Sequence, residues 1–231
     1  MKVVIQDLCK SFGSKQVLRN ITGEFEKGKI YGLLGKNGAG KTTLFNCMSS
    51  EIDYDSGEVY LLKDGKREEL NYKNMGFVYS TAILPEFLTG YEFVKFYMGI
   101  NIGNDRVDKT IDEYFELVHM DEADRYRLIN DYSLGMKNKI QLLMVLITKP
   151  DVIFLDEPLT SLDMVVAHDI KNLLLELKND RIIILSTHIM QVAVDLCDEI
   201  VILNNGTLTR FGEISMEDYA SLENRIMEEL E

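Results

Sequence analysis

The feature that most constrains the fold of this chain is a glycine-rich segment placed between a strand-like run and a helix-like run. Residues 35–42 read GKNGAGKT and match the pattern GxxxxGK[ST]. The apolar residues 29–35 before it are typical of a buried strand, and the residues after it are typical of a helix. Glycines let the backbone curl with its N–H groups facing inward, toward an anion at the positive end of the helix. The segment therefore predicts a phosphate-binding loop.

A nucleotide is the ligand expected for this loop, and its residues have separate roles. Lys41 is predicted to reach the β and γ phosphates, Thr42 to hold Mg²⁺, and Thr43 to contact the α phosphate. The nucleotide-binding residues expected in the loop are Gly35, Asn37, Gly38, Ala39, Gly40, Lys41, Thr42 and Thr43. The loop alone does not distinguish GTPases, kinases, ATPases and motor proteins.

The rest of the chain predicts an α/β fold with a mostly parallel sheet. Strand-like runs at residues 29–35, 152–158, 181–188 and 199–206 alternate with helical patterns, and three of them are almost continuously apolar. Continuous apolar runs are typical of parallel strands buried on both faces. Two runs near the start, in residues 2–8 and 57–62, alternate more and predict an antiparallel edge sheet.

The middle of the chain predicts a helical subdomain inserted between strands of the sheet. From residue 84 to residue 148 apolar residues recur three and four apart, and no strong strand pattern is present. We expect a nucleotide-binding α/β core in residues 1–79 and 150–212, a helical subdomain in residues 80–149, and an acidic C-terminal tail in residues 213–231. That tail is weakly amphipathic and is typical of a solvated helix.

Composition excludes several classes of protein. With 231 residues, 46% of them hydrophobic, the chain can bury a large core, and a net charge of −13 disfavours nucleic acid as a partner. Three widely spaced cysteines predict neither a disulfide framework nor a zinc site and suit a reducing compartment. No apolar run approaches the roughly 20 residues that span a bilayer, and no targeting segment is recognisable. We therefore expect a cytoplasmic protein.

Two further clusters belong to the same edge of the predicted sheet. Asp156 and Glu157 lie at the end of the strand-like run 152–158, and His188 ends the run 181–188. Open α/β sheets present their ligand-binding residues at the carboxyl ends of the strands. Asp156 is expected to position Mg²⁺, and Glu157 to orient and polarise an attacking water. His188 is predicted to contact the γ phosphate or to hold that water.

With these pieces in this order, the chain resembles the ATP-binding subunit of an ABC transporter over nearly its whole length. Residues 35–43 look like the Walker A motif of that family, residues 154–158 (FLDEP) like Walker B with its catalytic glutamate, and STH at 186–188 like the switch histidine. The resemblance implies that Phe12 stacks on adenine and that Asp163, in the D-loop-like SLD, belongs to the nucleotide site. It also implies an ABC ATPase fold.

The stretch YSLGM at residues 132–136 resembles the ABC signature LSGGQ, with leucine for one glycine and methionine for glutamine. In the family two subunits face each other head to tail, and each signature covers the ATP held by the other. The resemblance therefore assigns Ser133 and Gly135 to the nucleotide of a second copy. Where the family generally places a glutamine near the metal, this chain has Ser80, which is shorter.

The resemblance implies an ATPase that binds ATP and Mg²⁺ and powers transport through a separate membrane permease, at the inner face of the cell membrane. Glu157, His188 and Lys41 are the expected catalytic residues, and Ser80 a further residue near the metal. YSLGMK and the short chain are similar to two-component bacterial exporters of peptides, antibiotics or lipids. Two alternatives stay open: a soluble ABC-type ATPase, or a weakly hydrolysing, nucleotide-dependent assembly module.

Overall fold

Two β-sheets of different character form much of this computed structural model, which describes residues 1–101, 107–159, 164–213 and 226. The antiparallel sheet has the strand order β2 (Lys15–Glu26), β1 (Lys2–Phe12), β4 (Ser56–Lys63) and β5 (Lys66–Glu68). The larger sheet has the order β10 (Thr207–Glu213), β9 (Glu199–Asn204), β3 (Lys29–Leu34), β8 (Ile182–Thr187), β7 (Val152–Asp156) and β6 (Met75–Val78). Its strands from β9 to β6 run parallel, and β10 pairs antiparallel with β9.

The parallel strands are buried on both faces, which explains their continuous apolar sequences. In β7, Ile153 and Leu155 join one hydrophobic cluster, whereas Val152 and Phe154 join another on the opposite face. The first cluster also contains residues of α6 (Met164–Leu177) and α7 (Met190–Leu196), and the second contains residues of α1 (Lys41–Met48) and of the antiparallel sheet. Each buried aliphatic side chain contributes about 1.5–3 kcal/mol. The central strands are therefore rigid, and they fix the positions of the loops at their ends.

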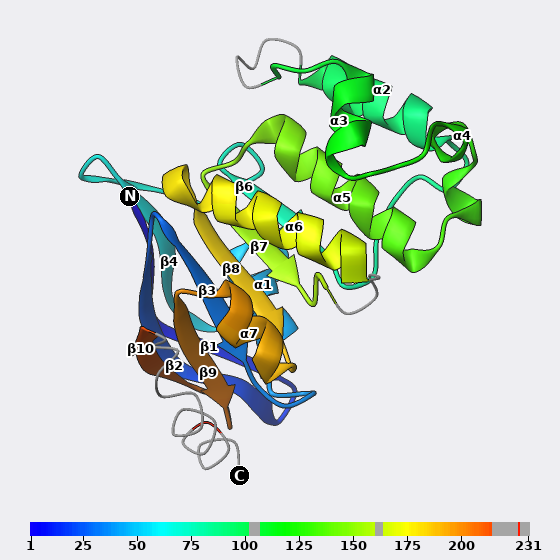
Figure 1. The fold of residues 1–231 in the computed structure, drawn as a ribbon. Helices are drawn as coiled ribbons and strands as arrows, with labels where there is room; N and C mark the ends of the chain where they lie inside the picture. Colours follow the sequence, from blue (N-terminus) through cyan, green and yellow to red (C-terminus); the bar gives the residue numbers. More distant parts are fainter. Residues whose placement is uncertain (102–106, 160–163, 214–225, 227–231) are drawn as a thin grey trace.

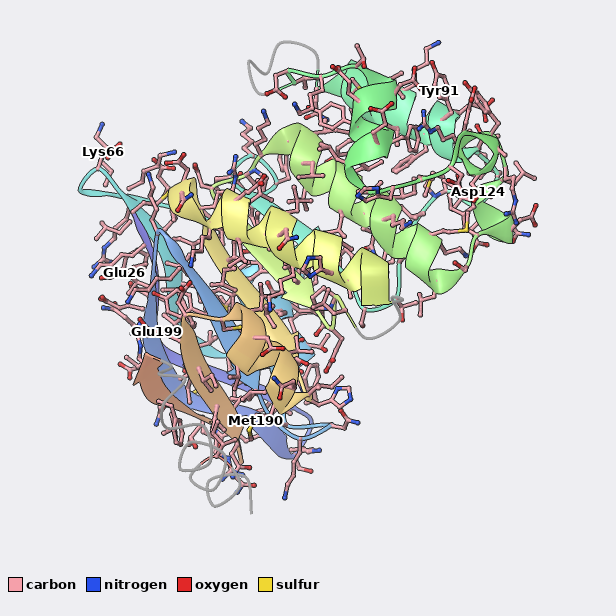
Figure 2. All side chains as sticks on the ribbon, in the orientation of Figure 1. Glu26, Lys66, Tyr91, Asp124, Met190 and Glu199 are labelled. Carbon is pink, nitrogen blue, oxygen red and sulfur yellow. The ribbon has the colours of Figure 1, made fainter. Side chains whose placement is uncertain are left out.

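The helices between β6 and β7 gather at one end of the molecule, away from the antiparallel sheet (Figure 1). They are α2 (Gly90–Ile100), α3 (Ile111–Leu117), α4 (Glu122–Arg125), the short 3-10 helix η1 (Ile129–Asp131) and α5 (Leu134–Thr148). Elsewhere in the chain, a second 3-10 helix, η2 (Lys178–Asp180), follows α6. Thr89 and Thr110 begin α2 and α3 with capping boxes, closed by glutamates three residues later. Tyr91 and Asp124, labelled in Figure 2, belong to this helical group.

The predicted parallel strands, the antiparallel pair of residues 2–8 with 57–62, and the α/β architecture are confirmed. The sequence did not predict β2, because its buried residues Leu18, Ile21 and Phe25 are spaced three and four apart. Irregularities in the pairing of β1 with β2 shift the register, so the strand loses simple alternation. Within the predicted helical stretch of residues 84–148, α3 begins only after the Thr110 cap and ends at Leu117.

Most of the acidic tail, residues 214–225 and 227–231, lies outside the described residues. In the part of the chain that the structure describes, no helix combines the length and apolar character needed to cross a bilayer.

Candidate functional site

The glycine-rich loop leads from β3 directly into α1. Gly40 precedes the helix with a φ of 105°, a conformation that L side chains rarely adopt, and a Cβ there would lie 2.9 Å from Val17 Cγ1. At Gly35 a Cβ would lie 2.6 Å from the Leu203 carbonyl oxygen, so both positions require glycine. No side chain caps the start of α1 and its first turn has no acidic residue. The N–H groups at this helix end are thus oriented for an anion.

Lys41, the first residue of α1, directs its ammonium group back into this loop. Its Nζ donates to the carbonyl oxygens of Gly35 at 2.7 Å and Lys36 at 3.4 Å, and lies 3.9 Å from Glu157 Oε1. Burial lowers the pKa of Lys41, while the carboxylates of Glu157 and Asp156 act in the opposite direction. A nearly buried cation with this many acceptors is suited to an anionic ligand that can replace them.

Asp156, the last residue of β7, joins the loop to the sheet edge. Its Oδ2 accepts a hydrogen bond from Thr42 Oγ1 at 2.9 Å, and Ser186 Oγ donates to Oδ1. Asp156 is buried, so these donors fix the position of its carboxylate. A hydroxyl and a carboxylate oxygen at the mouth of a phosphate-binding loop are the hard ligands that Mg²⁺ prefers. Thr42 and Asp156 therefore fit a magnesium site.

Glu157 and His188 lie side by side because β7 and β8 are parallel neighbours and end at the same edge. His188 Nδ1 is 2.9 Å from Glu157 Oε1 and 3.0 Å from Oε2, so an Nδ1–H group donates to the carboxylate. The Glu157 backbone has a φ of 52°, and its N–H group donates to Ser186 at the backbone oxygen (3.2 Å) and at Oγ (3.1 Å). These bonds hold a non-glycine residue in an uncommon conformation at the cavity edge.

A cavity of about 440 Å³ joins most of the residues that the sequence singled out. Its lining includes Phe12, Asn37, Gly38, Gly40, Lys41, Thr42, Thr43, Ser80, Asp156 and Glu157. The Phe12 side chain is half exposed, with Lys10 Nζ 5.0 Å from its ring centroid. Gly35 and His188 contact residues of this lining: the Gly35 carbonyl oxygen accepts from Lys41, and His188 bonds to Glu157. Ala39 and Lys36 line a neighbouring cavity. The size suits a small-molecule ligand.

Ser133 and Gly135 are not among the residues that line this cavity. Ser133 is the N-cap of α5, its Oγ accepting from the Met136 N–H at 3.2 Å, and Gly135 lies in the first turn of the same helix. The two predicted anion-binding elements, the glycine-rich loop and the start of α5, therefore do not line one cavity within this chain. Asp163 lies outside the described residues.

Sequence reasoning missed three residues at the site. Ser186 is fully buried and bonds both acidic residues of the strand end, and Lys15 and Val17 line the cavity beside Phe12. The signal for Ser186 was a hydroxyl residue closing an otherwise apolar strand. Lys15 and Val17 could have been inferred only if β2 had been recognised, because the β1–β2 turn brings them over the loop.

A phosphate-binding loop facing an Asp–Glu pair and a histidine at the carboxyl edge of a parallel sheet defines a P-loop nucleotide-binding ATPase. Residues 18–160 match the family described as ABC transporter. The chain belongs to this family, as an ATP-binding subunit. The ABC ATPase fold and the recognition of ATP, both predicted from the sequence, are thereby confirmed.

The similar proteins include subunits whose names state transport and one whose name states import. An uncharacterized ABC transporter ATP-binding protein of Bacillus subtilis, YxlF, is 31% identical over 91% of this chain and 70% of its own length. The bacitracin transport ATP-binding protein BcrA of Enterococcus faecalis is 32% identical, covering 93% and 71%. The sulfate/thiosulfate import protein CysA of Nitrosomonas europaea is 31% identical, covering 92% and 60%. A dimeric post-hydrolysis structure of the ATP-binding cassette MJ0796, with ADP and Pi, shares the fold at a TM-score of 0.77 and 22% identity, covering 92% and 100%.

Proposed function

We propose that this subunit hydrolyses Mg²⁺-ATP in a head-to-tail dimer and drives export through a separate permease at the inner face of the cell membrane. The observation that carries the proposal is the position of the Glu157 carboxylate, between His188 at 2.9 Å and Lys41 at 3.9 Å, on the wall of the loop cavity. A carboxylate in that position can accept a proton from a water that attacks the γ phosphate.

The other side chains of the cavity bind the phosphates, the adenine and the metal, or hold Glu157 in place. Lys41 neutralises charge on the β and γ phosphates, and Phe12 offers a half-exposed ring on which adenine stacks. Thr42 and Asp156 would hold Mg²⁺, which when bound neutralises phosphate charge. Ser80 lines the same cavity, and its short hydroxyl would reach the metal only through a water. His188 holds the Glu157 carboxylate in place.

In the proposed dimer, the second copy supplies the anion-binding element that does not line the cavity of the first copy. Ser133 and Gly135 begin a 15-residue helix whose N-terminal end is an anion-binding element away from its own cavity. We infer that each pair covers the γ phosphate bound by the other copy, with Asp163 at the same contact. Loss of that phosphate on hydrolysis would weaken the dimer, and the resulting separation of the two copies is the motion that would drive transport.

The permease contact is proposed for the start of the helical subdomain, residues 80–149. In this segment Ile83 and Phe87 are 77% and 80% exposed, and nearby Tyr72 is 82% exposed. Tyr72 also lines a cavity of about 490 Å³, together with Tyr79, Tyr97 and others. Exposed large apolar side chains around a cavity support a protein contact. The bacitracin relative supports transport through a permease. Transport assays in membrane vesicles containing this subunit and its permease would separate export from import.

The test of the hydrolytic role compares phosphate release by the wild type, Glu157→Gln and Glu116→Gln. Glu116 is exposed on α3 and serves as the matched control. We expect Glu157→Gln to bind ATP normally and to lose roughly 10²–10⁴-fold in turnover, the usual contribution of a general base. Wild-type turnover in Glu157→Gln would overturn the assignment. No turnover in the wild type, with or without the permease, would favour the nucleotide-dependent assembly module instead.

A further inference from the structure

A buried glutamine on α5 binds the backbone at the end of β6. Gln141 Oε1 accepts from the Tyr79 N–H at 3.0 Å, and Gln141 Nε2 donates to the Tyr79 carbonyl at 3.0 Å. The same Nε2 donates to Asn138 Oδ1 at 3.2 Å. Gln141 is only 3% exposed and lies in the otherwise apolar stretch of residues 140–147. A buried amide that uses both its oxygen and its nitrogen on one backbone residue has a specific structural task.

The bonds replace a missing strand partner. β6 is the edge strand of the larger sheet, and its pairing with β7 extends over Met75–Val78. Tyr79, the next residue, therefore has no ladder partner and uses the Gln141 side chain instead. Removing that side chain would leave a part-buried donor and a part-buried acceptor of Tyr79 without these hydrogen bonds, which is costly.

Tyr79 is also attached to the nucleotide-binding side. Its hydroxyl bonds to Glu51 Oε1, just beyond the end of α1, and its ring stacks on Phe77 with centroids 4.3 Å apart. Burial raises the pKa of Tyr79, which keeps the hydroxyl protonated as a donor. The following residue, Ser80, lines the nucleotide cavity. Tyr79 is thus held on one side by the segment that follows the phosphate-binding helix and on the other by α5.

The same α5 begins at Ser133, about two turns or ~12 Å before Gln141. A helix is stiff over that length, so a displacement at Gln141 is transmitted to Ser133. Gln141 binds the backbone of Tyr79, the residue immediately before Ser80, so the position of α5 bears directly on this edge of the cavity.

We propose that Gln141 is a positioning residue that couples the edge of the nucleotide cavity at Ser80 to the helix carrying Ser133, so that ATP bound in one cavity sets the position of the element offered to the second copy. This inference rests on the proposed head-to-tail dimer. It is separate from the hydrolytic chemistry, because Gln141 is not among the residues that line the nucleotide cavity.

The test uses Gln141→Met, which keeps an unbranched side chain of similar volume and removes both hydrogen bonds to Tyr79. Val145→Ala is the matched control, because Val145 is buried on the same helix and packs near Gly76 of β6 without bonding Tyr79. We expect similar losses of thermal stability in the two variants. Only Gln141→Met is expected to lose amide-exchange protection at Tyr79, and its kcat should fall about tenfold with KM unchanged, as for coupled residues of one network.

A second readout does not depend on hydrolysis. In the Glu157→Gln background, ATP-dependent association of two copies is measured by analytical ultracentrifugation, and adding Gln141→Met should weaken it about tenfold while ATP binding to the single chain stays within about twofold. Adding Val145→Ala should leave association unchanged. If both additions weaken association equally, or neither does, the coupling role is wrong. A wild type that associates on ATP without turnover would refute only the hydrolytic proposal.

Gln141→Glu supplies a conservative rescue in case Gln141→Met does not fold. A protonated carboxyl group can donate to the Tyr79 carbonyl and accept from its N–H group, whereas a carboxylate can only accept. Burial favours the protonated form. Association of the Glu157→Gln, Gln141→Glu protein should therefore approach that of Glu157→Gln alone as the pH falls from 8 to 6. A constant difference across that range would contradict the proposal.

Discussion

Replacing Gly90 with alanine should disturb the elbow at Ser133 from a distance. Gly90 is the buried first residue of α2, and a Cβ built on it would overlap the Tyr132 hydroxyl oxygen, with Tyr132 Cζ at 3.1 Å and the Arg125 carbonyl oxygen at 3.3 Å. Tyr132 is buried and immediately precedes Ser133. Because the carbonyl belongs to the backbone, the tyrosine ring is the group that must move.

The structure allows the cost to be worked out. The Tyr132 hydroxyl donates to the Asp124 carbonyl at 2.7 Å, and losing this bond around a buried group costs about 1–3 kcal/mol. Overpacking adds about 1–3 kcal/mol. The preference of helices for alanine over glycine returns about 0.5–1 kcal/mol. The net loss for Gly90→Ala is therefore about 1–5 kcal/mol, which corresponds to a fall of roughly 2–20 °C in Tm for a chain of this size.

The double variant of Gly90 and Tyr132 gives a sharper test of this overlap. Removing the hydroxyl with Tyr132→Phe should cost about 1–2 kcal/mol alone, yet it should relieve part of the overlap, so Gly90→Ala with Tyr132→Phe should be more stable than Gly90→Ala. Urea unfolding of the four proteins measures this interaction. Gly99→Ala is the control, since a Cβ there meets nothing within 4 Å in the same helix. Additive losses, or a Gly90→Ala protein as stable as Gly99→Ala, would refute the argument.

Two further predictions concern the nucleotide site and the sheet. Phe12→Ala should weaken ATP binding roughly 5–150-fold, the range for one lost base-stacking contact, and leave inorganic triphosphate binding unchanged; equal losses for both ligands would exclude stacking. Burial opposes ionisation of Glu199, but hydrogen bonds from Lys29 and Arg210 outweigh it and hold the Glu199 pKa below 4.5. The stabilisation from ionised Glu199 is therefore present above pH 4.5 and is lost as the pH falls through the lower pKa of Glu199 in the folded protein. In urea unfolding, Glu199→Gln should cost about 3 kcal/mol at pH 7 and progressively less toward pH 3. A cost that stays constant across this pH range would contradict this.

The parts of the fold that the sequence predicted are those with local causes. Strands β7 and β8 are buried on both faces, so their apolar runs are continuous, and the loop motif between β3 and α1 depends on a few adjacent residues. β2 has a non-local cause. Its irregular pairing with β1 sets which residues face the core, and nothing within residues 15–26 reveals that register.

The site divides in the same way. That Asp156, Glu157 and His188 share one edge follows from the direction of parallel strands. That Gln141 meets Tyr79 depends on how α5 is rotated and placed against the edge strand β6. From the sequence, Gln141 is only a polar residue within an apolar helix, which is equally consistent with an exposed position. Its burial and its two bonds to Tyr79 separate these readings.

The leucine in the signature-like stretch can now be judged by its backbone. Leu134 is the first residue of α5, so its φ is helical and negative, and its exposed side chain does not remove the N–H groups at the helix start. Ser133 Oγ accepts from Met136, and its hydroxyl hydrogen can still donate to an anion from outside. A left-handed conformation at residue 134 would have made leucine costly there, since only glycine tolerates it readily. The exchange of glycine for leucine is thus compatible with an anion-binding elbow at the start of α5.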